Sequence, residues 1–127
     1  MTFEFDPHAN LILVSAKLFG PARTLRLRLA LDTGATTTLI NQSRLMRIGY
    51  DPASSPERVQ ITTGSNVEFV ARLTLSRMKA FGQERADFPV LCHNLPPSAS
   101  VDGLLGLDFF RGLNLNIDFR DGLITLQ

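Results

Sequence analysis

Apolar and polar residues alternate along much of this chain, which predicts β-strands as its main element. The clearest case covers residues 25–31, where a leucine at every second position alternates with an arginine or alanine. The stretch 67–75 shows the same period and places Phe69 on the apolar face, as a core or interface residue. A shorter apolar run covers 123–126. We therefore expect an all-β fold whose strands each bury one face.

Only short segments have helical signals. Asn41 or Ser43 can begin a helix that Gly49 ends. Asp108 can cap a single helical turn that Gly112 ends. The pattern therefore adds one or two short helices to the predicted strands.

The composition narrows the range of functions. With 127 residues, of which 44% are hydrophobic and 20% charged, the chain fits one globular domain spanning residues 1–127. Its net charge of +1 argues against nucleic acid as a partner, and we interpret Arg23, Arg26 and Arg28 as a solvated strand face. No apolar stretch approaches the roughly 18 residues of a membrane-spanning helix. The single cysteine, Cys92, favours a reducing, cytoplasmic location.

The strand over 25–31 runs directly into Asp32, Thr33 and Gly34. Apolar neighbours partly desolvate Asp32, which makes its proton available for chemistry. Gly34 lets the backbone turn sharply and lets another chain approach closely, and the Thr33 hydroxyl can lock the turn. The same tripeptide can also be an ordinary turn after a strand.

A single aspartate is a poor catalyst of peptide hydrolysis. One group must deprotonate the attacking water while another protonates or stabilises the carbonyl oxygen. Two carboxylates about 3 Å apart do both, because they share one proton. Asp102, Asp118 and Asp121 lack the surroundings of Asp32, since none follows an apolar run and precedes Thr-Gly or Ser-Gly. A symmetric homodimer supplies a second Asp32, and its activity is then expected to fall on dilution.

A second motif, DGLLGLDFF, covers residues 102–110. Together with LDTGA at 31–35, it resembles the retropepsin-like aspartic proteases, and most of all the bacterial single-domain members. The resemblance extends over about residues 25–126. It implies a closed-barrel acid-protease fold with one lobe per chain. It also implies an aspartic endopeptidase that acts on peptides or proteins without a cofactor.

The resemblance implies roles for individual residues. Asp32 is the expected catalytic carboxylate, Thr33 is expected to bond across the dimer axis, and Gly34 is expected to present its carbonyl to the substrate. A hairpin with its tip over 62–66 is expected to act as a flap, although it can also be an ordinary surface turn. The implied substrate-binding residues are Ala35, Thr36, Ile61, Thr62, Thr63, Gly64 and Ser65. The implied supports of the active loop are Thr38, Leu104, Leu105 and Gly106.

The chain departs from the retroviral members at the positions that brace their dimer. Those members carry an acidic residue soon after the alanine and an arginine after the second glycine. This chain has Thr36, Thr37 and Leu107 at these places. The dimer contacts are therefore left unassigned, with the terminal segments 3–5 and 123–126 as candidates by analogy.

Ala35 bears on the pH dependence. Pepsin-like sites usually place serine there, and its hydroxyl can stabilise an ionised pair of aspartates. Alanine cannot, so we expect an optimum less acidic than that of pepsin.

Other chemistries have weaker support. Cys92 and His93 suggest a thiol nucleophile with its base, but neighbours on a strand point to opposite faces, so Cys92 is better interpreted as a core residue. His8, His93 and Cys92 lack the spacing of a metal site, so no metal is expected. Two alternatives stay open. The domain can be a catalytically silent dimerisation or peptide-binding module, or part of a longer regulatory protein.

Overall fold

The computed structural model describes residues 1–127 with the exception of the Thr63 side chain. The strands are β1 (Thr2–Glu4), β2 (Leu13–Phe19), β3 (Thr24–Leu31), β4 (Leu39–Ile40), β5 (Arg58–Thr63), β6 (Asn66–Ala80), β7 (Gln83–Cys92), β8 (Gly103–Leu105), β9 (Leu115–Asp118) and β10 (Leu123–Leu126). The helix α1 covers Gln42–Arg47, and short 3-10 turns cover η1 (Pro52–Ser54), η2 (Pro97–Ala99) and η3 (Leu107–Phe110).

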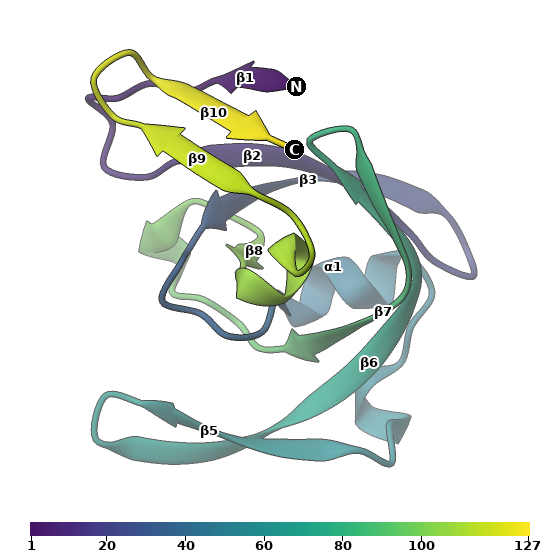
Figure 1. The fold of residues 1–127 in the computed structure, drawn as a ribbon. Helices are drawn as coiled ribbons and strands as arrows, with labels where there is room; N and C mark the ends of the chain where they lie inside the picture. Colours follow the sequence, from purple (N-terminus) through teal and green to yellow (C-terminus); the bar gives the residue numbers. More distant parts are fainter.

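Strands β2, β3, β8, β4, β7 and β6 form a closed barrel in that order, because β6 pairs back with β2 (Figure 1). The pairs β3–β8 and β4–β7 are parallel, and the other neighbours are antiparallel. Closure removes the open strand edges that would otherwise pair with other chains. The expected all-β, closed-barrel fold with a short helix is therefore confirmed.

Two elements extend beyond the barrel at opposite ends of the molecule (Figure 1). Strand β5 pairs with the first part of β6 in a hairpin, whose turn at Gly64 and Ser65 has a positive φ of 59° at Gly64. At the other end, β1, β10 and β9 form a separate three-stranded sheet that carries both chain termini (Figure 1). Neither β1 nor β9 has a second neighbour within the described chain.

The core fills the barrel through alternating side chains. Strand β2 buries Val14, Ala16 and Leu18, and its partner β3 buries Leu27 and Leu29. Burying a leucine side chain contributes about 1.5–3 kcal/mol to folding. The period-two pattern of β3 thus holds the strand rigidly up to its last residue, just before Asp32.

The predicted helix forms as α1, between Asn41 and Gly49. Leu45 and Ile48 are fully buried against the barrel core, and Gly49 adopts a positive φ of 106°. The Asn41 side chain does not cap the helix but accepts a hydrogen bond of 2.9 Å from the backbone N–H of Leu95. No helix of the described structure is long and apolar enough to cross a membrane.

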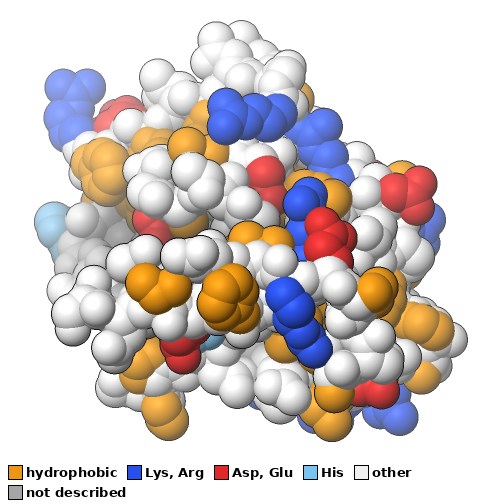
Figure 2. Space-filling view, turned by 90° about the horizontal axis from the view of Figure 1, so that it is seen from below, with side chains coloured by type: hydrophobic (Ala, Val, Ile, Leu, Met, Phe, Trp, Pro, Cys, Tyr) orange, Lys and Arg blue, Asp and Glu red, His pale blue; other side chains and the backbone are white. Residues whose placement is uncertain are grey.

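Phe69 was predicted as a core or interface residue, and the core alternative is wrong. Its side chain is 70% exposed and that of Val67 is 54% exposed, whereas the intervening side of β6 buries Val70. This part of β6 lies in the projecting hairpin, so the face that carries Val67 and Phe69 does not meet the barrel core as the alternation suggested. Figure 2 views the molecule from the β5–β6 end and shows hydrophobic side chains exposed on this face.

Candidate active site

Asp32 lies at the point where β3 leaves the barrel. Its backbone N–H donates to the carbonyl oxygen of Leu105 at 3.0 Å, which extends the parallel pairing of β3 with β8 by one bond. The chain then turns back on itself: the Ala35 N–H donates to the Asp32 carbonyl at 3.1 Å, and the Gly34 N–H donates to Asp32 Oδ1 at 2.8 Å. The carboxylate is thus held by its own loop and is half-buried.

A buried hydrogen-bond relay supports this loop from below. Thr38 is fully buried, and its hydroxyl donates to Asp108 Oδ1 at 2.7 Å while accepting the Gly106 N–H at 3.1 Å. The Thr38 backbone N–H also lies 3.0 Å from both oxygens of Asp108. A further bond of 2.9 Å runs from the Leu107 N–H to the Ala35 carbonyl. The two motifs of the sequence are therefore tied together at this point.

Asp108 has a different role from the one that its sequence position predicted. We expected it to cap the helical turn over Phe109 and Phe110, but it lies inside η3 and its side chain caps nothing there. It binds Thr38 instead, 70 residues away in sequence. The sequence signal for this contact was a carboxylate two residues after Gly106. The same pattern also fits a helix cap, so the signal was ambiguous.

Glycine is required where the second motif passes behind the loop. A Cβ atom on Gly106 would lie 2.8 Å from the Ala35 carbonyl oxygen and 2.9 Å from the Thr37 carbonyl carbon. A Cβ on Gly103 would overlap the Leu39 carbonyl oxygen. Both neighbours are backbone atoms of paired segments and have little freedom to move. The glycines therefore permit the close backbone packing that positions the loop.

A cleft of about 660 Å³ opens beside the loop. Of the residues expected to bind substrate, Ala35, Thr36, Ile61 and Thr62 line this cleft, as does Leu104 from the second motif. Leu105 and Gly106 are buried behind the loop. Gly34 also lines the cleft, so the cleft begins two residues from Asp32 in the sequence.

The remaining expected residues lie elsewhere. Gly64 and Ser65 form the exposed turn of the β5–β6 hairpin and do not line the cleft of the single chain. The Thr63 side chain lies outside the described residues. The cleft also has an apolar lining that was not predicted from the sequence, which comes from Leu39, Leu91, Leu95 and Pro96.

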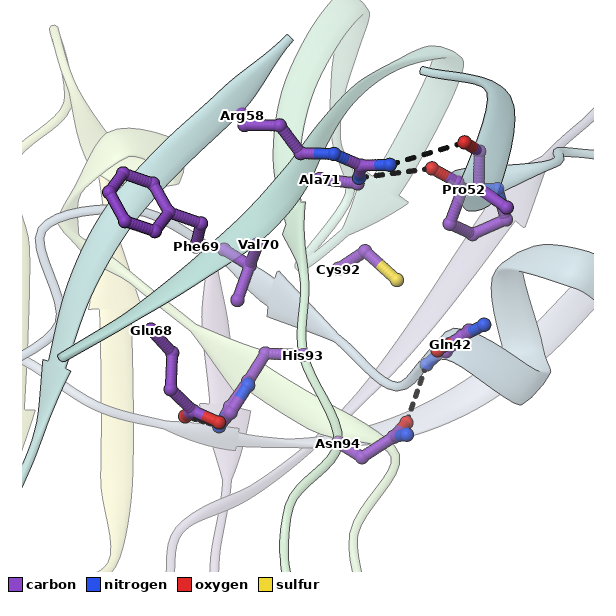
Figure 3. Close-up of a pocket in the computed structure, with 11 residues that line it drawn as sticks. Gln42, Pro52, Arg58, Glu68, Phe69, Val70, Ala71, Cys92, His93 and Asn94 are labelled. Carbon is purple, nitrogen blue, oxygen red and sulfur yellow. Dashed lines mark hydrogen bonds and ion pairs between the residues drawn. The ribbon is translucent and has the colours of Figure 1, made fainter. Parts of the chain in front are cut away.

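Glu68 of the hairpin lies beside His93 of the barrel at the edge of the cleft. His93 Nε2 lies 3.9 Å from Glu68 Oε2, and Figure 3 shows the two side chains directed toward each other. On the other side of the hairpin, the Arg58 guanidinium donates to the carbonyl oxygens of Pro52 and Ala53 at 3.1 and 3.2 Å (Figure 3). The base of the hairpin is therefore anchored on two sides.

The structure gives Cys92 no features of a nucleophile. Its side chain is 7% exposed, and burial raises the pKa of its thiol, an effect that the charge of Arg58 only partly offsets. A catalytic cysteine needs the opposite shift, toward thiolate. Within the described residues, no group of three or more His, Cys, Asp or Glu side chains is arranged to hold a metal ion.

Comparisons with known proteins agree with this arrangement. A family model described as aspartyl protease matches residues 14–109, which include the first motif and all of the second except Phe110. The structure is similar to that of a retropepsin-like aspartic protease from Rickettsia conorii, with a TM-score of 0.74, 18% sequence identity, and coverage of 99% of this chain and 88% of that one. A comparison with curated protein sequences finds no match. The chain therefore belongs to the aspartyl protease family and has the retropepsin-like fold.

Proposed function

We propose that this protein is an aspartic endopeptidase that is active as a homodimer, with one Asp32 from each copy. The observation that carries the proposal is the position of Asp32, whose carboxylate accepts a hydrogen bond from the N–H of Gly34, a residue that lines the cleft. Within the described chain, no other carboxylate shares this position. Peptide hydrolysis needs a base and an acid, so the missing partner is assigned to a second copy related by a two-fold axis.

In the proposed mechanism the two Asp32 carboxyl groups share one proton. The ionised one takes a proton from water, whose oxygen attacks the carbon of the scissile carbonyl. The protonated one donates its proton to the carbonyl oxygen, which gives a tetrahedral gem-diol. The C–N bond then breaks as one carboxyl group protonates the leaving nitrogen and the other takes a proton back from the gem-diol.

The β5–β6 hairpin is proposed to act as a flap over the bound peptide. Ile61 and Thr62 line the cleft from the hairpin side, and the exposed turn at Gly64 has few contacts to restrain it. Closure of such a hairpin would exclude bulk water and align the peptide with the carboxylates. The largely apolar wall of the cleft suits an aliphatic or aromatic substrate side chain.

Two features support assembly into a homodimer. The β1–β10–β9 sheet leaves β1 and β9 each with an unpaired edge in the described chain, and such edges readily pair with another chain. Thr33 is exposed directly beside Asp32, where a two-fold axis would bring it against its counterpart. The free, buried Cys92 fits a reducing compartment, and we place the protein in the cytoplasm.

The test is digestion of a peptide library with wild type, Asp32→Asn and Asp87→Asn. Asp87→Asn is the matched control, because Asp87 is exposed and its positive φ of 49° suits asparagine. We expect cleavage by wild type and the control but none by Asp32→Asn, with circular dichroism showing that all three fold. Cleavage that persists in Asp32→Asn contradicts the mechanism. A folded wild-type dimer that cleaves nothing supports the silent binding module instead.

A further inference from the structure

Basic side chains from three neighbouring strands meet on the outer wall of the barrel. The strand register places Lys17 of β2 opposite Arg26 of β3 on one side and opposite Lys79 of β6 on the other. All three side chains are exposed, and residues directly opposite each other in antiparallel strands have Cβ atoms about 5 Å apart. Arg77 lies two residues before Lys79 on β6, and Arg28 lies two residues after Arg26 on β3, both on the same face. We call these five residues the basic face.

Few carboxylates balance this charge. Glu84 of β7 pairs with Arg77 at 3.2 Å. Among the described residues, Lys17, Lys79 and Arg26 have no carboxylate oxygen within 4.0 Å. Like charges directly opposite each other destabilise a sheet. Lys79 has Glu84 opposite it on β7, so the repulsion is greatest at Lys17, which has a basic residue opposite it on both sides and which a bound anion would stabilise.

The basic face is hollowed. Lys17, Arg26, Arg77 and Lys79 line a cleft of about 480 Å³, with Phe19 and one acidic residue, Glu84, among the other lining residues. This cleft shares no lining residue with the one beside Asp32. An anion bound here would leave the substrate cleft open.

Two cationic side chains already cover the Phe19 ring in the cleft. The Arg77 guanidinium lies 3.8 Å from the centre of the Phe19 ring, and Lys17 Nζ lies 5.3 Å from it. A nucleic acid would lack the open stacking surface that single strands use. A bilayer presents a flat surface, whereas this part of the protein is hollowed.

An extended acidic peptide fits the remaining features. Alternate residues of an extended chain lie about 6.6–6.8 Å apart on one side, within reach of long lysine and arginine side chains on adjacent strands. We propose that the basic face binds an acidic, extended peptide segment of a protein partner, at a site separate from the Asp32 cleft. This inference goes beyond the proposed protease activity and does not depend on it.

The experiment measures fluorescence anisotropy of a short labelled peptide of alternating glutamate and serine. Asp32→Asn serves as the background, so that the probe stays uncleaved whether or not the wild type is a protease. A peptide with glutamine in place of glutamate, an oligothymidylate of equal charge and vesicles containing phosphatidylglycerol are compared at the same ionic strength. Lys17→Glu is the test variant. Arg120→Glu is the charge-matched control, because Arg120 is 88% exposed and outside the basic face.

We expect the acidic peptide to bind, and Lys17→Glu to weaken its binding about tenfold or more while Arg120→Glu changes it little. We also expect Lys17→Glu to melt no lower than its parent, since the new carboxylate lies between Arg26 and Lys79. Equal binding by Lys17→Glu, equal affinity for the glutamine peptide, or no binding of the acidic peptide would each overturn the proposal. Tighter binding of the oligothymidylate or the vesicles would assign the face to a different partner and also overturn it.

Discussion

Replacing Thr38 by valine tests the relay that supports the active loop. Valine keeps the shape of threonine but removes the hydroxyl that donates to Asp108 and accepts from the Gly106 N–H. Losing a hydrogen bond to a charged group costs about 1.5–3 kcal/mol, and leaving a buried N–H unsatisfied costs about 1–3 kcal/mol. Because Thr38 is fully buried, water cannot replace the lost partner. We therefore expect the free energy of unfolding to fall by about 2–5 kcal/mol, a large share of the about 5–15 kcal/mol of a typical domain.

The assay is urea unfolding followed by far-ultraviolet circular dichroism. It is run at several protein concentrations, because dimerisation would add to the apparent stability. Thr74→Val is the matched control: Thr74 is exposed on β6, and its replacement is expected to change stability by no more than about 0.5 kcal/mol. The reasoning would be refuted if the free energy of unfolding of Thr38→Val lay within about 0.5 kcal/mol of the wild-type value.

A double-mutant cycle with Asp108→Asn sharpens this test. If Thr38 and Asp108 act through their mutual bond, the double variant should lose less stability than the sum of the single variants, by about 1 kcal/mol or more. Additive losses would show that the two side chains act independently. The same variants should lose peptidase activity, because the loop they support carries Asp32.

Three further changes have expected outcomes. Ala35→Ser places a hydroxyl close to the Asp32 pair, so the acidic limb of the kcat/KM profile should move to lower pH; an unmoved limb would count against the explanation given for alanine. Cys92 should react with iodoacetamide about tenfold or more slowly than a free thiol until the protein unfolds, because burial raises its pKa; rapid labelling of the native protein would disprove this. Backbone N–H groups of Asp121 and Arg120 lower the pKa of Asp118, so its contribution to stability is full above its ordinary value of 3.8 and is lost as pH falls through the folded value. Urea titrations should therefore find Asp118→Asn less stable than wild type at about pH 6 and equal to it at about pH 2, whereas a pH-independent difference would contradict this.

The alternation of apolar and polar residues was sufficient to predict the strand that carries the first motif. Strand β3 alternates apolar and polar residues and runs directly into Asp32, so both the strand and the position of Asp32 at its end could be predicted. The role of Thr38 came from family resemblance, and the structure places its hydroxyl beneath the loop. The closed barrel also followed from the resemblance, since alternation alone does not distinguish a barrel from a sandwich.

Long-range contacts could not be predicted in this way. Alternation in β6 is regular, but it cannot tell which part of the strand faces the barrel and which part projects, so it did not decide whether Phe69 is a core or an interface residue. Strand β4 has two residues, too few to show a period, and β7 contains Pro89 and a residue with positive φ at Asp87. The basic face depends on register, which brings Lys17, Arg26 and Lys79 together from three strands and has no signal within any one of them.

The central claim is that the active site exists only when two copies of Asp32 meet. The most direct measurement is the specific activity of the wild type on a cleaved peptide over a dilution series, with the assembly state followed in parallel by sedimentation. The account predicts that specific activity falls together with the dimer fraction, so that well below the dissociation constant the cleavage rate varies with the square of the protein concentration. A specific activity that stays constant where the protein sediments as a monomer would contradict it.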